Sequence, residues 1–189
     1  PMRMARLRGL GQSGGGEADH HRIVARQHQI DENHLPERGE GSGITYQGYG
    51  YISDSSVATI VNNGTLIGNT AGQTLTINPT TFTNNALVNA TAGTVSLSPT
   101  TLTNAGTLRI QSGGVMNTGT STTFSSAGSG IDLQSGGTFG LNGTYTISGG
   151  GLAIVSGATV NLESAMTVSE FANLNFQGGE AVLTSTLTN

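Results

Sequence analysis

The chain has 189 residues, of which 34% are hydrophobic and only 10% are charged, and its formal net charge is −4. Glycine, threonine, serine and asparagine together account for 90 residues, a bias typical of either disorder or a repeat. The low hydrophobic and charged fractions exclude an ordinary two-layer globule. Disordered chains usually carry high net charge or much proline, whereas this chain has a net charge of −4 and four prolines, so a repeat protein is favoured over disorder.

The first part of the chain differs in chemistry from the rest. Residues 1–41 contain six of the seven arginines, six of the eleven acidic residues and all four histidines, and the glycines that follow resemble a linker. We therefore predict a domain boundary near residue 42, with a poorly ordered charged leader at 1–43 and a repeat domain at 44–189. A short helix from His20 to about His34 would have only a thin apolar stripe, so we expect a frayed or disordered segment.

Two patterns in the leader could carry chemistry. Gly11-Gln12-Ser13-Gly14-Gly15 satisfies the G-x-S-x-G pattern of a nucleophile elbow, which needs a strand before the serine and a helix after it. Neither flank is predicted, so a flexible linker is favoured. The histidines could gather around a metal, but a zinc site needs fixed spacing, and His21 and His28 lie about two helical turns apart. The histidine and acidic residues concerned are His20, His21, His28, His34, Glu17 and Asp31. We expect no catalytic, cofactor or metal site there.

After residue 44, short corners of small residues recur at spacings of 21, 21, 23, 21 and 22 residues. The corners are Thr70-Ala71-Gly72, Thr91-Ala92-Gly93, Ser112-Gly113-Gly114, Ser135-Gly136-Gly137, Ser156-Gly157-Ala158 and Gly178-Gly179. A short apolar stretch precedes each corner, beginning at Thr65, Ala86, Thr107, Ile131, Leu152 and Leu174. The alternation within these stretches predicts half-buried strands.

Two further strands follow each corner. The inward residues predicted for the second strand are Leu75, Ile77, Val95, Leu97, Val115, Phe139, Leu141, Val160, Leu162 and Val182. Those predicted for the third strand are Phe82, Leu102, Phe124, Ile147, Val168 and Leu187. Three short strands per period of about 21 residues cannot close a core alone, but stacked periods can.

The fold class that follows is all-β: a right-handed, single-stranded parallel β-helix of about six turns over residues 44–189. Small corner residues permit the bends, and threonine columns and stacked asparagines supply contacts between turns. Because the chain ends within a third strand and begins with proline, we expect a fragment of a longer repeat array. Tyr46, Tyr49 and Tyr51 precede the first predicted turn and are expected to cover that end of the coil.

The run TLTNAGTLRIQSGGVMNTGT from Thr101 to Thr120, with VNNGTL at Val61 and SGATVNLES at Ser156, resembles the repeats of bacterial surface β-helix proteins. These are autotransporter passenger regions and filamentous-haemagglutinin-like adhesins. The resemblance covers about 145 residues and rests on generic G-T-L and S-G-G patterns. It implies a secreted or surface-exposed bacterial segment that acts as a stalk or adhesive surface, with host or matrix glycans or proteins as partners.

The composition also argues against several classes of binding and catalysis. A pI near 5.4 without lysine disfavours nucleic-acid and membrane-surface binding, and no apolar run is long enough to span a membrane. The absence of cysteine excludes disulfides and thiol chemistry. We expect no catalysis. The alternatives are a carbohydrate-active β-helix, either a polysaccharide lyase or a tailspike-like depolymerase, and a fibre that assembles end to end.

A polysaccharide-cleaving enzyme would need clustered carboxylates. The repeat region offers Asp54, Asp132, Glu163, Glu170 and Glu180 with one base, Arg109. Glu163 and Glu180 are expected to approach one another in adjacent turns, but solvated side chains that keep the rod soluble are the favoured interpretation. Asp132 is expected above Arg109 as a surface pair of little energetic worth.

The repeat region also carries threonine alternations and three glycosylation sequons. The threonine alternations TLTI, TYTI and STLT resemble the hydroxyl arrays of ice-binding solenoids, but the outward residues are expected to vary, which disfavours that function. The sequons at Asn63, Asn89 and Asn142 are expected by chance in a chain so rich in Asn and Thr.

Overall fold

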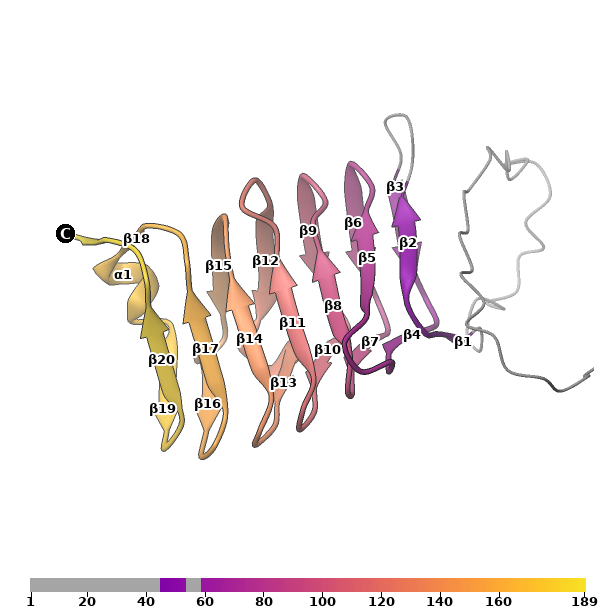
Figure 1. Cartoon of the computed structure of the whole chain (residues 1–189). Helices are drawn as coiled ribbons and strands as arrows, with labels where there is room; N and C mark the ends of the chain where they lie inside the picture. The colour runs from indigo at the N-terminus through magenta and orange to yellow at the C-terminus, as the bar shows by residue number, and fades with distance from the viewer. Residues whose placement is uncertain (1–44, 54–58) are drawn as a thin grey trace, which may run out of the picture.

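The computed structural model describes residues 45–53 and 59–189, and these form a parallel β-solenoid of about 21 residues per turn (Figure 1). Seven turns follow one another along a single axis, each built from three short strands. The predicted β-helix is therefore confirmed, but with seven turns in place of the expected six. The extra turn is the first one, which begins at Thr45. The predicted leader at 1–43 lies outside the described residues.

Equivalent strands of successive turns lie side by side and form three columns. The first column is β1 (Thr45–Gln47), β4 (Thr65–Gly68), β7 (Leu87–Ala90), β10 (Thr107–Ile110), β13 (Ile131–Leu133), β16 (Leu152–Val155) and β19 (Leu174–Gln177). The second column is β2 (Gly50–Ser53), β5 (Thr74–Asn78), β8 (Thr94–Leu97), β11 (Val115–Thr118), β14 (Thr138–Leu141), β17 (Thr159–Leu162) and β20 (Glu180–Leu183). The third column is β3 (Thr59–Asn62), β6 (Thr81–Asn84), β9 (Thr101–Asn104), β12 (Thr123–Ala127), β15 (Thr144–Ser148), β18 (Met166–Thr167) and β21 (Leu187–Thr188).

Only the second column is hydrogen-bonded without interruption through all seven turns. The first column divides into a five-stranded and a two-stranded sheet between β13 and β16, and the third column divides likewise between β15 and β18. Two short helices complete the described elements: the 3-10 helix η1 (Gly128–Gly130) and α1 (Val168–Phe171). The last two turns are thus joined to the first five through one continuous ladder, β14 with β17.

The core is a column of apolar side chains inside the coil. Strands of four or five residues place alternate side chains inward, so Leu75 and Ile77 of β5 lie beneath Val95 and Leu97 of β8, and all four are fully buried. The third column contributes Phe82, Leu102 and Phe124 in the same way. Phe124 also makes an edge-on contact with Phe139 of the second column, with ring centroids 6.4 Å apart.

Three predicted inward residues are placed differently. In β11 it is Met116 that lies inward, in register with Val95 and Phe139, so the prediction of Val115 was wrong. In β20 the inward residue is Ala181, paired with Val160, and Val182 lies outward beside Asn161. Val168 belongs to α1 and is 47% exposed. In β11 and β20 two neighbouring positions are apolar, and pairing with the preceding turn decided the register. In the sixth turn the buried residue is Met166 of β18, which lies just before α1.

Tyr46 and Tyr51 lie in strands of the first turn and Tyr49 lies in the bend between these strands, although the sequence placed all three before the first turn. Tyr46 of β1 is in register with Leu66 and packs partly against the core, and its hydroxyl donates to the Tyr49 carbonyl at 3.2 Å. Tyr51 of β2 lies outward in register with Thr76 and is 60% exposed. This segment is the first turn of the coil.

A ladder of buried amides runs beside the apolar core at the end of the third column. Asn62 Nδ2 donates to Asn84 Oδ1 at 2.7 Å, and Asn84 Nδ2 donates to Asn104 Oδ1 at the same distance. Asn104 Nδ2 then donates to Ser126 Oγ at 2.9 Å. The same amide groups also reach backbone carbonyls, including Asn84 to Thr107 and Asn104 to Gly130. The predicted stacked asparagines are therefore confirmed, and they satisfy buried polar groups at the bends of the first four turns.

Glycine is required at the bends of the coil for two reasons: some positions have a positive φ, and others leave no space for a Cβ atom. Five of the six predicted corners hold a glycine in the left-handed region, with φ between 71° and 92°. Gly143, in the bend before β15, combines both constraints: its φ is +72°, and an added Cβ would collide with the carbonyl oxygen of Thr122. Gly72 has a similar φ of +71° but nothing within 4 Å.

Candidate functional site

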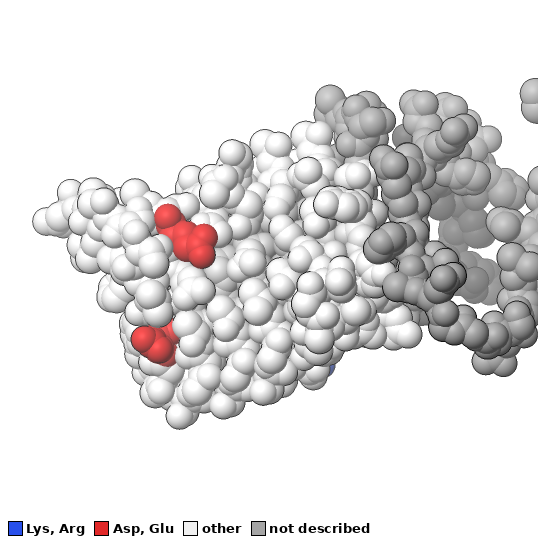
Figure 2. Space-filling model, viewed as in Figure 1, with Lys and Arg blue, Asp and Glu red and all other residues white. Residues whose placement is uncertain are grey.

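The two carboxylates on which a polysaccharide-cleaving site would depend do not meet. Glu180 is the first residue of β20 and pairs in register with Thr159, the first residue of β17. Glu163 follows the last residue of β17. The two positions are therefore separated by about four residues along the strand direction, or roughly 13 Å. Their expected approach was wrong, and Figure 2 shows the acidic side chains on this face as two separate spots near the C-terminal end.

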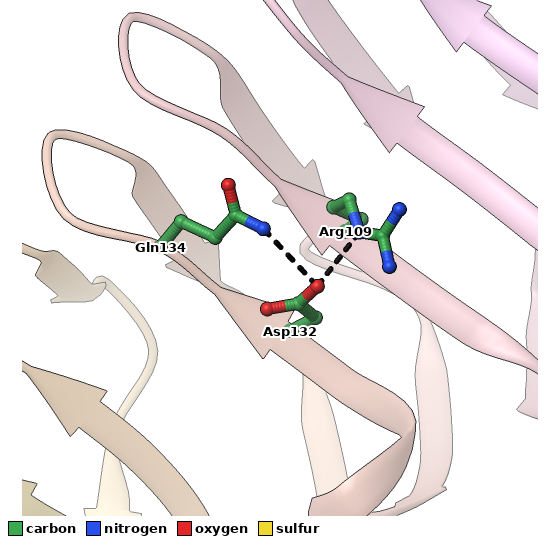
Figure 3. A network of polar contacts seen from close by, with 3 residues as sticks. All are labelled: Arg109, Asp132 and Gln134. Carbon is green, nitrogen blue, oxygen red and sulfur yellow. Dashed lines mark hydrogen bonds and ion pairs between the residues drawn. The ribbon is translucent and has the colours of Figure 1, made fainter.

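The predicted pair in the first column does form. Arg109 of β10 and Asp132 of β13 are in register, and Arg109 Nε lies 2.7 Å from Asp132 Oδ2 (Figure 3). Gln134 Nε2 donates to the same oxygen at 3.3 Å. The two charged side chains are 38% and 39% exposed, so water screens the attraction and the pair adds little to stability. The opposite charges of Arg109 and Asp132 largely cancel, so this cluster adds little net charge to the outer face.

A shallow depression of about 430 Å³ lies at the bend between the third and first columns in the second to fourth turns. It is lined by Asn63, Gly64, Thr65, Asn85, Ala86, Leu87, Gly106, Thr107 and Arg109. On its rim Asn85 Nδ2 donates to Asn63 Oδ1 at 3.0 Å. Most of the lining surface is apolar, and the amides of Asn63 and Asn85 and the Arg109 guanidinium add groups that can hydrogen-bond to a ligand. The sequence did not indicate this depression, because it is assembled from three bends about 21 residues apart.

The outer surface of the third column is far more regular than the sequence suggested. In its five-stranded sheet the first outward row is Thr59, Thr81, Thr101, Thr123 and Thr144, and the second is Val61, Thr83, Thr103, Ser125 and Thr146. We call these ten residues the hydroxyl face. Eight of them are exposed, and Thr81 and Thr83 are half-buried. The expectation that the outward residues vary was therefore wrong for this column.

Tyr145 has a clearly displaced pKa. Burial raises its pKa from 10.0 to about 12, and the negative charge of Glu170 adds to the effect. The phenol hydroxyl contacts Met166 Sδ at 3.8 Å inside the coil. Glu170 itself caps α1: it accepts from the Thr167 backbone N–H at 2.7 Å, while its own N–H donates to Thr167 Oγ1. Neither group lines the depression beside Arg109.

The three sequons differ in access. Asn63 is exposed, whereas Asn89 and Asn142 are only 7% and 6% exposed. The Oδ1 atoms of these two buried amides have no hydrogen-bond partner in the described part of the chain. Only the first sequon is therefore accessible in the folded coil.

Other predicted candidates lie outside the described residues, namely Gly11–Gly15, Asp54, the four leader histidines and their acidic neighbours. Among residues 45–53 and 59–189 there is no group of three or more metal-binding side chains of the His, Cys, Asp or Glu types. In the same part of the chain no helix has the length and apolarity needed to cross a membrane.

The coil thus presents a neutralised ion pair, a shallow depression and a regular hydroxyl face. Comparisons of this chain with protein-family models, with curated proteins and with solved structures find no match.

Proposed function

We propose that this chain is a structural or adhesive segment of a secreted or surface-exposed bacterial β-helix protein. The observation that carries the proposal is the solenoid itself, because seven stacked turns give most of the chain the form of a rod with long, repetitive outer faces. Solenoids of this kind offer extended binding surfaces because each repeat contributes the same surface position. The resemblance of the TLTNAGTLRIQSGGVMNTGT run to adhesin repeats supports the same function.

Host or matrix glycans and proteins are the partners that we propose for the adhesive role. The depression beside Asn63, Asn85 and Arg109 is where a polar ligand would find amide and guanidinium donors. We expect the chain to bind a subset of an immobilised glycan and matrix-protein array, and Arg109→Ala with Asn85→Ala to weaken that binding. Ser169→Ala, on the exposed helix α1, is the control. A blank array together with cleavage of a soluble polysaccharide would overturn the proposal.

End-to-end association is a second candidate, favoured by the last described turn. Phe176, Leu183 and Leu187 there are 47%, 39% and 42% exposed, although the equivalent residues Ile154, Leu162 and Met166 of the preceding turn are buried. A further layer of strands would cover them. Concentration-dependent sedimentation that Leu187→Glu abolishes would support assembly between copies, and a monomer at all concentrations would contradict it.

The carbohydrate-active alternative now lacks the pair on which it depended, since Glu163 and Glu180 lie at opposite ends of their strands. It would require another acidic pair. Turnover of an acidic polysaccharide that is lost on Glu163→Gln or Glu180→Gln would restore it.

A further inference from the structure

The hydroxyl face differs from the other two outer faces of the same coil. Nine of its ten residues carry a hydroxyl, and none is charged or aromatic. The corresponding row of the second column runs Tyr51, Thr76, Ser96, Asn117, Gly140, Asn161 and Val182. That of the first column runs Gln47, Ile67, Asn89, Arg109 and Asp132. Stacking alone therefore does not demand threonine at both outward positions, because the other columns stack with varied residues.

The hydroxyls of this face are left to the solvent. Within the described part of the chain, none of the nine makes a side-chain hydrogen bond to protein. Threonines elsewhere behave differently: Thr122 Oγ1 donates to the Pro99 carbonyl at 2.6 Å, and Thr118 Oγ1 donates to the Asn142 carbonyl at 2.8 Å. Each hydroxyl of the face thus keeps one donor and two acceptor sites for an external partner.

The positions of these hydroxyls are fixed by the fold. Along a strand the two rows are about 6.6 Å apart, and successive turns are about 4.8 Å apart. Branching at Cβ restricts χ1 of threonine, so each hydroxyl has few orientations available. The buried amide ladder behind this column, with Asn84 at 0% exposure, holds the turns in register. The result is a two-dimensional lattice of hydroxyls and methyls ordered before any ligand binds.

We propose that the hydroxyl face binds ice. A surface that repeats in two dimensions binds most tightly to a partner that also repeats in two dimensions, because each further turn of the coil then adds an equivalent contact. A mineral surface would call for carboxylates, and a sugar polymer for aromatic rings or amides, none of which the face carries. A neutral lattice of donors and acceptors matches a neutral lattice of water. Threonine hydroxyls exchange hydrogen bonds with lattice waters while the γ-methyls lie against the water between them.

This inference is independent of the proposed adhesive role, which depends on the depression at the bend beside Arg109. The ten residues of the hydroxyl face include none of those lining that depression. Loss of one function therefore leaves the other measurable.

The test uses the full chain carrying a fluorescent label at its N-terminus. An ice hemisphere is grown slowly from a dilute solution, and the protein content of ice and liquid is compared with that of albumin, which ice excludes. We expect the chain to be enriched in the ice relative to albumin and to slow ice recrystallisation. Thr103→Tyr, at the centre of the face, should reduce both effects to the albumin level.

Thr76→Tyr is the matched control, because Tyr51 already occupies the adjacent position of that second-column row. It should retain ice binding. If Thr103→Tyr fails to fold by circular dichroism, Thr103→Val replaces it, since valine keeps the shape and removes the hydroxyl, and it should weaken ice binding. Exclusion of the unmodified chain from ice would overturn the proposal. So would equal loss in the Thr103 and Thr76 variants, or binding to crystalline cellulose or chitin without binding to ice.

Discussion

Asn84 occupies the centre of the buried amide ladder, and its side chain is completely inaccessible to solvent. Its Nδ2 donates to Asn104 Oδ1 and to the Thr107 carbonyl, and its Oδ1 accepts from Asn62 Nδ2. One side chain therefore satisfies polar groups of the turns before and after it. Loss of this amide leaves several buried groups without partners, which costs more than the hydrogen bonds themselves contribute.

Replacing Asn84 with alanine should lower the free energy of unfolding by about 2 to 4 kcal/mol, because buried donors and acceptors in two neighbouring turns lose their partners. Asn85→Ala is the control, since Asn85 is exposed and pairs only with Asn63 across the surface. It should change stability by less than about 0.5 kcal/mol. Urea denaturation of the two variants measures the difference. Equal losses would show that the ladder is not a structural element.

Tyr145 makes stability depend on alkaline pH. Its pKa in the folded chain, about 12, lies above the ordinary value of 10.0, so the neutral phenol favours the folded state. This contribution is fully present below pH 10 and is lost as the pH rises through about 12. Tyr145→Phe removes the titrating group, and its stability should fall less than that of the unmodified chain between pH 10 and 12. Melting temperatures across that range provide the measurement. Parallel pH profiles for the two proteins would contradict it.

At the scale of single elements, the bends constrain sequence more than the strands do. Gly143→Ala introduces both an unfavourable φ and a collision with the Thr122 carbonyl, whereas Gly72→Ala introduces only the unfavourable φ. We expect about 1 to 2 kcal/mol of destabilisation for Gly72→Ala and about 1 to 3 kcal/mol more for Gly143→Ala. Thermal denaturation of both variants tests the ranking. A smaller loss for Gly143→Ala would mean that the bend relaxes freely.

The joint between the fifth and sixth turns is the weakest connection between elements. The first and third columns are interrupted there, and Gly149, Gly150 and Gly151, all with positive φ, form the bend before β16. Because each turn is stabilised chiefly by its neighbours, the last two turns should open as a unit before the central ones. Hydrogen exchange should be faster across 152–189 than across 87–127. Uniform protection would contradict this division.

The strands and the parallel stacking were predictable because apolar alternation and corner spacing report directly on them. The inward residue was not predictable where neighbouring positions are both apolar, as with Val115 and Met116, since pairing with Val95 decides it. The placement of Glu163 and Glu180 could have been predicted, because their separation of 17 residues is shorter than one turn. The hydroxyl face becomes visible only when the three columns are separated, because along the chain its threonines are mixed with those of the second column.

At the scale of the whole molecule, the solenoid depends on register: residues about 21 positions apart lie directly beside one another through seven turns. Register determines which side chains are buried, which amides form the ladder and which hydroxyls form the outer lattice. A shift by one residue would bury the hydroxyl face and expose the core. The proposals about adhesion and ice therefore depend on the same geometric property.

Disulfide formation between introduced cysteines tests that register most directly, and the chain contains no cysteine of its own. Thr76 and Ser96 are register partners in the uninterrupted second column, whereas Ser98 lies two residues beyond Ser96 on the same face. Thr76→Cys with Ser96→Cys should form a disulfide under mild oxidation and retain the native melting temperature, because paired Cα atoms lie within bonding range. Thr76→Cys with Ser98→Cys should remain reduced. Preferential closure of the Ser98 pair, or closure of neither pair, would contradict the stacked solenoid.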